Sequence, residues 1–304
     1  MWKIVALLIT LLLGGCQMVT IDDLPEEQVT EQNADKLNVE QAVEEQQEMT
    51  KKEEFIDLLG TVFNLKWSER KNDDARPLTY LALGDSLTRG IGDEQNLSGY
   101  AGRLANAMEL WPAVTEVEMD NRGKNGRHSE KVLELLARGH YDEELAQADL
   151  ITMTIGGNDV MKVVKADLFA LKKEMFDTAR SPFAARYNQI IQEIRKRNEA
   201  APIILVGFYN PFSIITDEFT PFESIINEWN EEMRLVAEAD ANACFVPVDD
   251  FFMSNEDLVY HTDFFHPNAR GYERMTERII ETMVQCDIET MSGGWIGFEE
   301  ETNE

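Results

Sequence analysis

The sequence predicts an α/β fold in which three layers, α/β/α, are built around an open, mainly parallel five-stranded sheet. From residue 78 onwards, short apolar runs alternate with longer amphipathic stretches of helical spacing. Strands and helices that alternate in this way form parallel sheets through right-handed crossovers. Hydrophobic residues make up 43% of the 304 residues and charged residues 28%, which is ordinary for a globular protein with a buried core.

The predicted strands are short apolar runs. The first ends at Gly84, and the fourth is almost wholly apolar, as expected for a strand inside a parallel sheet. In chain order the strands cover residues 78–83, 114–119, 150–155, 202–208 and 244–248.

The predicted helices fill the intervals between these strands. They cover residues 100–110, 129–138, 161–199, 222–239 and 267–284. Ser129 is expected to cap the second helix, because a serine oxygen accepts the free N–H groups of a first turn. Pro182 is expected to break the third helix, since proline has no N–H. Pro267 is expected to open the last helix, where that N–H would have no partner.

The first residues of the chain predict export. Lys3 precedes an apolar run over residues 4–13 and small residues precede Cys16, which is the pattern of a signal peptide, here over residues 1–15. The run is too short to cross a bilayer core, which needs about 20 residues. Leu13-Gly14-Gly15-Cys16 resembles the lipobox of bacterial lipoproteins. We therefore expect a protein that is lipid-anchored through Cys16 to the extracellular face of the cell membrane, with an ordinary cleaved secretory signal as the alternative.

Composition divides the rest of the chain. Residues 16–54 are rich in Glu, Asp and Gln and predict an acidic flexible tether, because they cannot bury enough apolar area to fold. Residues 55–76 predict an amphipathic lead-in helix, residues 77–286 the globular domain and residues 287–304 an acidic C-terminal tail. The formal charge of −29 argues against a nucleic-acid partner, since so acidic a surface repels phosphate backbones.

Cysteine usage predicts neither a disulfide scaffold nor a metal centre. After Cys16 only Cys244 and Cys286 remain, without the spacing of metal ligands. We expect both to pack as small hydrophobic side chains. A single bridge between them is the alternative in a protein outside the cell.

Residues that can carry chemistry directly follow the predicted strands. Gly84-Asp85-Ser86-Leu87 follows the first strand, Asn121 to Gly126 the second, Gly156-Gly157-Asn158-Asp159 the third and residues 261–268 the fifth. Open α/β sheets bind ligands at the carboxyl ends of their strands, so these loops should converge. A serine on a strand-to-helix turn exposes its hydroxyl, and Asp263 can orient the imidazole of His266 three residues later. The convergence predicts an acyl-transfer site.

These four blocks resemble the signatures of the SGNH hydrolase family, also called G-D-S-L lipases and esterases, over about residues 77–285. The resemblance implies a flavodoxin-like sheet and is closest to the lipoprotein-type members of Gram-positive bacteria. It implies Ser86 as the nucleophile, His266 as the base and Asp263 as the acid that orients the base.

The resemblance also implies an oxyanion hole. Its donors would be the backbone N–H groups of Ser86 and Gly126 and the side-chain amide of Asn158. Gly126 is preferred to Gly123 because the family glycine usually lies five positions after the asparagine of this loop, here Asn121. No metal ion or organic cofactor is implied.

The implied function is that of a membrane-anchored extracellular serine esterase that hydrolyses acyl or acetyl esters. Small molecules, envelope glycans and lipids are all candidate substrates. Two alternatives stay open: an acyltransferase that uses the same triad on envelope glycans, and a noncatalytic envelope-binding lipoprotein that retains the fold.

Other polar residues near these loops receive structural interpretations. His261 is a rival base in the last loop, whereas His128 and His140 are expected to be core or surface histidines. Asp85 and Asp159 are expected to hold their loops through backbone hydrogen bonds.

Three further residue pairs are also given structural roles. Asp249-Asp250 is expected to cap a helix rather than bind a metal. Phe251-Phe252 and Phe264-Phe265 are expected in the core, where one face could line an acyl pocket.

Overall fold

The computed structural model describes residues 65–67, 75–167, 170–213, 221–252, 259–296 and 298–300. The predicted signal peptide, the Cys16 lipidation site, the acidic tether and most of the lead-in helix lie outside these residues. Within the described ranges, no helix is both long enough and apolar enough to cross a membrane.

The predicted sheet is confirmed. It contains β2 (Arg76–Gly84), β3 (Val114–Gly123), β4 (Leu150–Thr154), β5 (Ile203–Val206) and β6 (Ala243–Val246). The strands are ordered β3-β2-β4-β5-β6 and every neighbouring pair is parallel. Because the chain passes from β2 to β3 on one side and then to β4 on the other, the strand order reverses at β2. Ligands of such sheets bind at this switch point.

The burial of each strand follows its place in the sheet. β4 and β5 lie inside the sheet and are buried along their whole length, in keeping with their apolar sequences. β3 forms one edge and exposes Glu116 and Glu118. Charged side chains on an edge strand discourage pairing with other chains.

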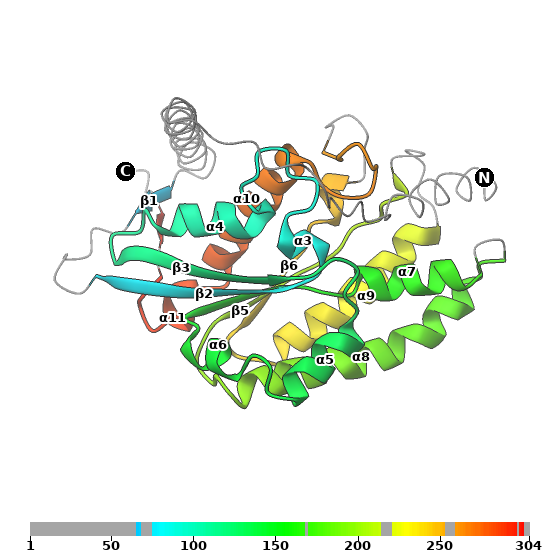
Figure 1. Cartoon of the computed structure of the whole chain (residues 1–304), viewed down its shortest axis with the longest axis horizontal. Coiled ribbons are helices and arrows are strands. Elements are labelled where there is room, and N and C mark those ends of the chain that lie inside the picture. The colour runs from blue at the N-terminus through cyan, green and yellow to red at the C-terminus, as the bar shows by residue number, and fades with distance from the viewer. Residues whose placement is uncertain are drawn as a thin grey trace, which may run out of the picture.

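Helices cover both faces of the sheet (Figure 1). One core cluster joins the sheet to α4 (Gly99–Met108), α10 (Ala269–Gln285) and α11 (Ile288–Met291). A second cluster joins the opposite face to α5 (Ser129–Ala137), α6 (Asp142–Gln147), α7 (Gly157–Ala166), α8 (Lys173–Arg195) and α9 (Pro221–Glu238). The short α3 (Ser86–Arg89) follows β2 directly. The three-layer α/β/α architecture is therefore confirmed.

The long helical stretch was predicted to break at Pro182, and this prediction is wrong. α7 ends at Ala166 and α8 runs from Lys173 through Pro182. The apolar face of α8 is buried on both sides of the proline, at Phe176 and Phe183. Burial of this face offsets the backbone hydrogen bond that proline removes.

Two predicted helix starts are also corrected. His128, not Ser129, occupies the N-cap position of α5, and the Ser129 hydroxyl donates instead to Asp159. Asn268, not Pro267, precedes α10, and its side chain accepts a hydrogen bond from Gly271 N at 2.9 Å. Pro267 is held outside the helix by an antiparallel bridge to Tyr260.

The segments predicted to flank the domain contain regular structure. Within the predicted lead-in helix, β1 (Leu65–Trp67) pairs antiparallel with β7 (Phe298–Glu300). The predicted acidic tail begins with α11, where Ile288 is buried, and Ile296 is also fully buried. The folded part of the chain therefore extends beyond residue 286.

Cys244 and Cys286 form a disulfide, contrary to the expectation that they pack as free thiols. Cys244 lies in β6 and Cys286 directly follows α10. Packing of α10 against the sheet brings their Cα atoms to 6.4 Å, within the range that a disulfide spans.

A buried ion pair shapes the loop between α3 and α4. Arg103 binds both carboxylate oxygens of Asp93, at 2.6 and 2.9 Å, and both side chains are almost fully buried. Asp93 also accepts the backbone N–H groups of Leu97 and Gly99. Burial alone would raise the pKa of Asp93, but the hydrogen bonds from Arg103 and the backbone lower it overall.

Asp93→Ala should therefore lower the free energy of unfolding by about 3–5 kcal/mol, because it leaves the Arg103 guanidinium buried without a counter-charge. Urea denaturation followed by circular dichroism would measure the change. Glu231→Ala, which removes an exposed partner of Arg234, serves as the control and should have little effect. Equal losses for the two variants would contradict the importance of the buried pair.

Candidate active site

Ser86 is the first residue of α3, at the carboxyl end of β2. Asp85 caps the helix by accepting the Leu87 N–H at 3.0 Å. Gly84 has a φ of +151°, and a Cβ there would lie 2.5 Å from the carbonyl oxygen of Thr154. Glycine is therefore required at this close approach, which allows the chain to turn sharply and place the Ser86 side chain at the switch point of the sheet.

His266 and Asp263 reach Ser86 from the loop before α10. His266 Nε2 lies 3.0 Å from Ser86 Oγ, and His266 Nδ1 lies 2.6 Å from Asp263 Oδ2. Because a carboxylate faces Nδ1, that nitrogen carries the proton and Nε2 is free to accept one. The three residues that the sequence analysis selects for nucleophile, base and orienting acid therefore lie in one hydrogen-bonded line.

The environment of Asp263 keeps it ionised. Burial alone would raise its pKa, but the hydrogen bond from the His266 ring and those from the His266 and Phe265 N–H groups lower the pKa to about 2. Both N–H groups donate to Asp263 Oδ1 at 3.0 Å. One carboxylate oxygen thus binds the backbone while the other binds the imidazole, which fixes the side chain.

The loop that carries this pair is closed on itself. His261 N donates to the carbonyl of His266 at 2.8 Å, and Phe264 N donates to the carbonyl of His261 at 2.9 Å. Phe264 has a left-handed φ of +55° and its side chain is 49% exposed. The expectation that Phe264 belongs to the core is therefore wrong, whereas Phe265 lines the cleft beside Ser86.

The loop after α3 supports the histidine from the other side. A Cβ at Gly92 would lie 2.5 Å from the carbonyl oxygen of Pro267 and 3.1 Å from His266 Cβ, so only glycine fits there. Glu94 accepts the N–H of Ala269 at 2.8 Å, in the first turn of α10. The buried Asp93 pair in the same loop therefore helps to hold the His266 loop in place.

The predicted oxyanion donors are only partly brought together. Asn158 lies in the first turn of α7, lines the cleft with Ser86 and donates to the carbonyl of Arg127 at 3.1 Å. Gly126 is exposed with a φ of +68°, and no described contact joins it to Ser86. Gly123 instead packs on α3, where a Cβ would lie 2.4 Å from Arg89 N. Gly126 as a donor stays a prediction.

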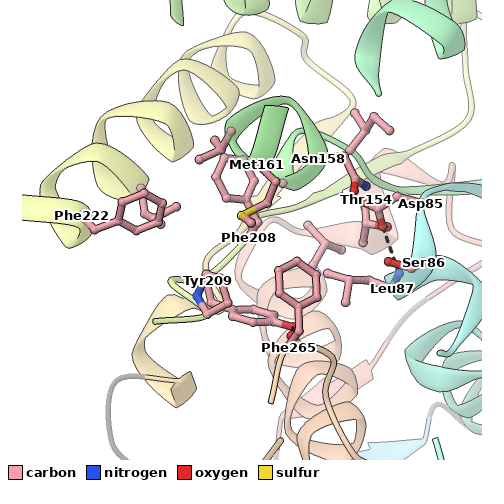
Figure 2. Close-up of a pocket in the computed structure, with 17 residues that line it drawn as sticks. Asp85, Ser86, Leu87, Thr154, Asn158, Met161, Phe208, Tyr209, Phe222 and Phe265 are labelled. Atoms are coloured by element: carbon pink, nitrogen blue, oxygen red, sulfur yellow. Dashed lines mark hydrogen bonds between the residues drawn. The ribbon is translucent and has the colours of Figure 1, made fainter. Parts of the chain in front are cut away.

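A narrow cleft opens beside Ser86, with about 40 Å³ of space for the centres of water-sized molecules. It is bordered by the ends of β4 and β5, by α7, by the first turns of α9 and by Phe265. Figure 2 shows Ser86 and Asn158 at one end of the cleft and Phe222 at the other. The Ser86 hydroxyl, which faces the His266 imidazole, and the Asn158 amide thus lie at one mainly apolar cleft. This arrangement is suited to attack on an ester carbonyl.

A comparison with protein-family models matches residues 82–274 to the GDSL-like Lipase/Acylhydrolase family. The chain belongs to this family. It is therefore an ester-hydrolysing enzyme, and its all-parallel sheet is the SGNH hydrolase fold that the sequence analysis predicts.

Relatives and solved structures agree with this assignment. Protein YpmR of Bacillus subtilis, which is uncharacterised, is 33% identical over 66% of this chain and 80% of its own length. The spore germination lipase LipC of Bacillus licheniformis is 27% identical over 66% of this chain and 94% of its own. The crystal structure of the lipase Lip_vut3 from a goat rumen metagenome superposes with a TM-score of 0.57, at 26% identity over 67% of this chain and 97% of its own.

Asp85, the residue before Ser86, lies at one end of a buried chain of hydrogen-bonded hydroxyl groups. Thr154 Oγ1 donates to Asp85 Oδ1 at 2.8 Å and lies 2.7 Å from Thr88 Oγ1. Thr88 Oγ1 lies 2.8 Å from the Tyr100 hydroxyl, which is 3.3 Å from Thr152 Oγ1. Burial raises the pKa of Asp85 to about 6, although hydrogen bonds from Leu87 and Thr154 and the nearby His266 oppose the rise.

Sequence reasoning missed these supporting residues. Thr152 and Thr154 are the only hydroxyl residues in the strand Leu150–Thr154, and they alternate within it, so both point to the same face. Two hydroxyl residues on one face of a fully buried strand could have indicated a buried hydrogen-bond network, because a buried hydroxyl needs a hydrogen-bond partner. The expectation that Asp85 ties its loop through backbone hydrogen bonds is confirmed by the bond from Leu87 N.

Asp159 and the other histidines are not part of the Ser86 hydrogen-bonded line. Asp159 accepts the N–H and hydroxyl of Ser129 and joins α5 to α7, as expected of a loop-holding residue. His261 faces Glu94, at 3.5 Å, and Thr262 rather than Ser86. His128 precedes α5, and the His140 ring packs edge-on against Tyr141.

The remaining residue pairs also lie away from Ser86. Asp250 pairs with Arg278 at 2.8 Å, and Asp249 and Asp250 open a short 3₁₀ helix, Asp249–Phe252. Phe252 is buried in the core as expected, whereas Phe251 lies under the Arg278 guanidinium.

The raised pKa of Asp85 makes stability depend on pH. The folded chain binds this proton up to a pH of about 6, whereas the unfolded chain releases it near pH 4. Between these values, the contribution of Asp85 to the free energy of unfolding falls as pH rises, by about 2–3 kcal/mol in total. Asp85→Asn, which binds no proton, should therefore gain stability relative to the wild type between pH 4 and pH 7.

Urea unfolding of the wild type and of Asp85→Asn at pH 4 and at pH 7 measures the difference between their free energies of unfolding. Asp250→Asn, which changes an exposed carboxylate, is the control and should not gain in the same way. If Asp85→Asn and the wild type lose or gain stability in parallel, burial of an ionisable Asp85 is not what sets the pH dependence.

Proposed function

We propose that the chain is a serine esterase in which Ser86, His266 and Asp263 form the catalytic triad. The observation that supports this most strongly is the hydrogen-bonded line from Asp263 through His266 to Ser86, with separations of 2.6 and 3.0 Å. Family membership supports hydrolysis of acyl esters, and the line supplies the groups that this reaction needs.

The proposed reaction begins at Ser86. Its Oγ attacks the ester carbonyl while His266 Nε2 takes the hydroxyl proton, and Asp263 stabilises the imidazolium that forms. His266 then gives the proton to the leaving alcohol as the ester C–O bond breaks. A water molecule then attacks the acyl-enzyme while His266 takes one of its protons. His266 passes this proton to Ser86 Oγ as the bond between the acyl carbon and Oγ breaks, which releases the acid and restores Ser86.

The developing oxyanion would lie at the start of α3. Its proposed donors are the N–H groups of Ser86 and Gly126 and the amide of Asn158, each such donor contributing about 3 kcal/mol to the lowering of a barrier of this kind. The position of Asn158 on the cleft supports its part in this set.

We further propose that the enzyme acts at the extracellular face of the cell membrane and is anchored there by a lipid on Cys16. The support is the sequence before Cys16, with its single lysine, short apolar run and small residues. Two acyl chains on one cysteine provide the stable anchoring that a single chain does not.

Ser86→Ala and His266→Ala should each lower kcat for p-nitrophenyl acetate by several orders of magnitude, and the double variant should lose no more, because triad members act as a unit. Asp263→Asn should lower kcat by about 10³ to 10⁴, since an amide favours the wrong imidazole tautomer. His261→Ala is the matched control from the same loop and should change kcat less than about tenfold. Loss of turnover in His261→Ala with an active His266→Ala would reassign the base.

Cys16→Ala should move the protein from the membrane fraction to the medium or the soluble fraction of cells, because no residue then accepts the lipid. Gln17→Ala, at the neighbouring position, should leave the protein on the membrane. Fractionation followed by immunoblotting would measure both. Sedimentation of Cys16→Ala with membranes would refute the lipid anchor.

A further inference from the structure

The cleft beside Ser86 continues as a narrow apolar slot. Along the slot Met161 and Phe208 line one wall and Tyr209 and Phe265 the other, as Figure 2 shows. The slot runs from Ser86 towards Phe222, in the first turn of α9. Met161, Phe208 and Tyr209 are each more than nine-tenths buried, so the walls belong to the core rather than to the surface.

The backbone polar groups of Phe208 and the hydroxyl of Tyr209 already have partners within the protein. The side-chain amide of Asn230 binds both backbone groups of Phe208, accepting from its N–H at 3.1 Å and donating to its carbonyl at 2.8 Å. The Tyr209 hydroxyl donates to the carbonyl of Phe265 at 2.7 Å. These walls therefore present hydrocarbon to a bound group, which suits an aliphatic chain and not a hydroxylated one.

The wall at Phe208 is held rigidly. A Cβ at Gly156 would lie 2.9 Å from the rings of both Phe208 and Phe183, so the two rings fill the space against the start of α7. Phe183 in turn stacks on Trp229 with ring centres 4.8 Å apart. Because these side chains are already fixed, the binding of an acyl chain would not have to order them, and the free-energy cost of ordering is avoided.

Aromatic rings lie at the far end of the slot. Phe222 meets Phe212 edge to face at 4.9 Å and Phe176 at 5.7 Å. Phe222 lines the slot, and the other two rings pack against it. An acyl chain that entered the slot from Ser86 would therefore meet Phe222.

We propose that this slot binds the acyl chain of the ester and that the enzyme selects linear acyl groups longer than acetyl, with Phe222 setting the upper limit. The inference rests on the proposed function, in which Ser86 attacks the ester carbonyl. An acetyl group would occupy only the mouth of the slot beside Ser86, and the apolar walls beyond it would stay unused. Each additional methylene that reaches those walls leaves water and strengthens binding in the transition state.

The test is a series of p-nitrophenyl esters from acetate to laurate, each kept below its micelle concentration. In the wild type, kcat/KM should rise by up to about fourfold for each methylene buried, and should level off or fall once the chain reaches Phe222. Phe222→Ala should move the optimum to longer chains. Phe222→Leu, a milder truncation, should move the optimum in the same direction and guards against misfolding of the alanine variant.

Phe251→Ala is the matched control, because it also truncates a half-buried phenylalanine, but one that packs on Arg278 away from the slot. It should leave the optimum unchanged. A wild-type series that is flat or falls from acetate onwards, or an optimum that neither Phe222 variant moves, would overturn the slot while leaving the esterase intact. Absence of turnover for every ester, with no labelling of Ser86 by a fluorophosphonate, would instead overturn the proposed function and the slot with it.

Discussion

The hydroxyl of Thr154 joins the two strands on which the candidate site is built. It donates to Asp85, accepts the N–H of Thr88 at 3.2 Å and sits where the register pairs Thr154 with Gly84. Through these bonds the end of β4 fixes the turn from β2 into α3, and with it the position of Ser86. Since Asn158 follows β4 and Ser86 follows β2, one buried side chain sets how the two face each other.

One side of Ser86 is polar and the other is apolar. Both characters follow from the hydrogen bonds that the nearby polar groups make. On one side, polar contacts from the Asp93 loop and from Asp263 hold His266 in place. On the other side, Asn230 binds the backbone of Phe208 and the Phe265 carbonyl binds the Tyr209 hydroxyl, so that this wall presents mainly hydrocarbon to the cleft. A polar reaction centre beside an apolar surface suits the proposed hydrolysis of esters of aliphatic acids.

Much of the fold and the triad geometry could be predicted from the sequence, because alternating periodicity and residues placed directly after strands carry that information locally. Predictions failed where tertiary packing decides. The pairing of Cys244 with Cys286 depends on where α10 docks, and the passage of α8 through Pro182 depends on the burial of Phe176 and Phe183. The hydroxyl chain beneath Asp85 joins β4, α3 and α4, so no single stretch of sequence reveals it. Gly126 was selected by spacing alone, and the described contacts leave its role as a prediction.

Ser86 and His266 are separated by 180 positions, and the strand that carries Ser86 is the first of the five while His266 precedes the last long helix. The contact between their side chains therefore needs the loop before α10 to lie beside α3. A chain cut short before this loop would still contain all five strands of the sheet, but it would lack the imidazole that faces Ser86.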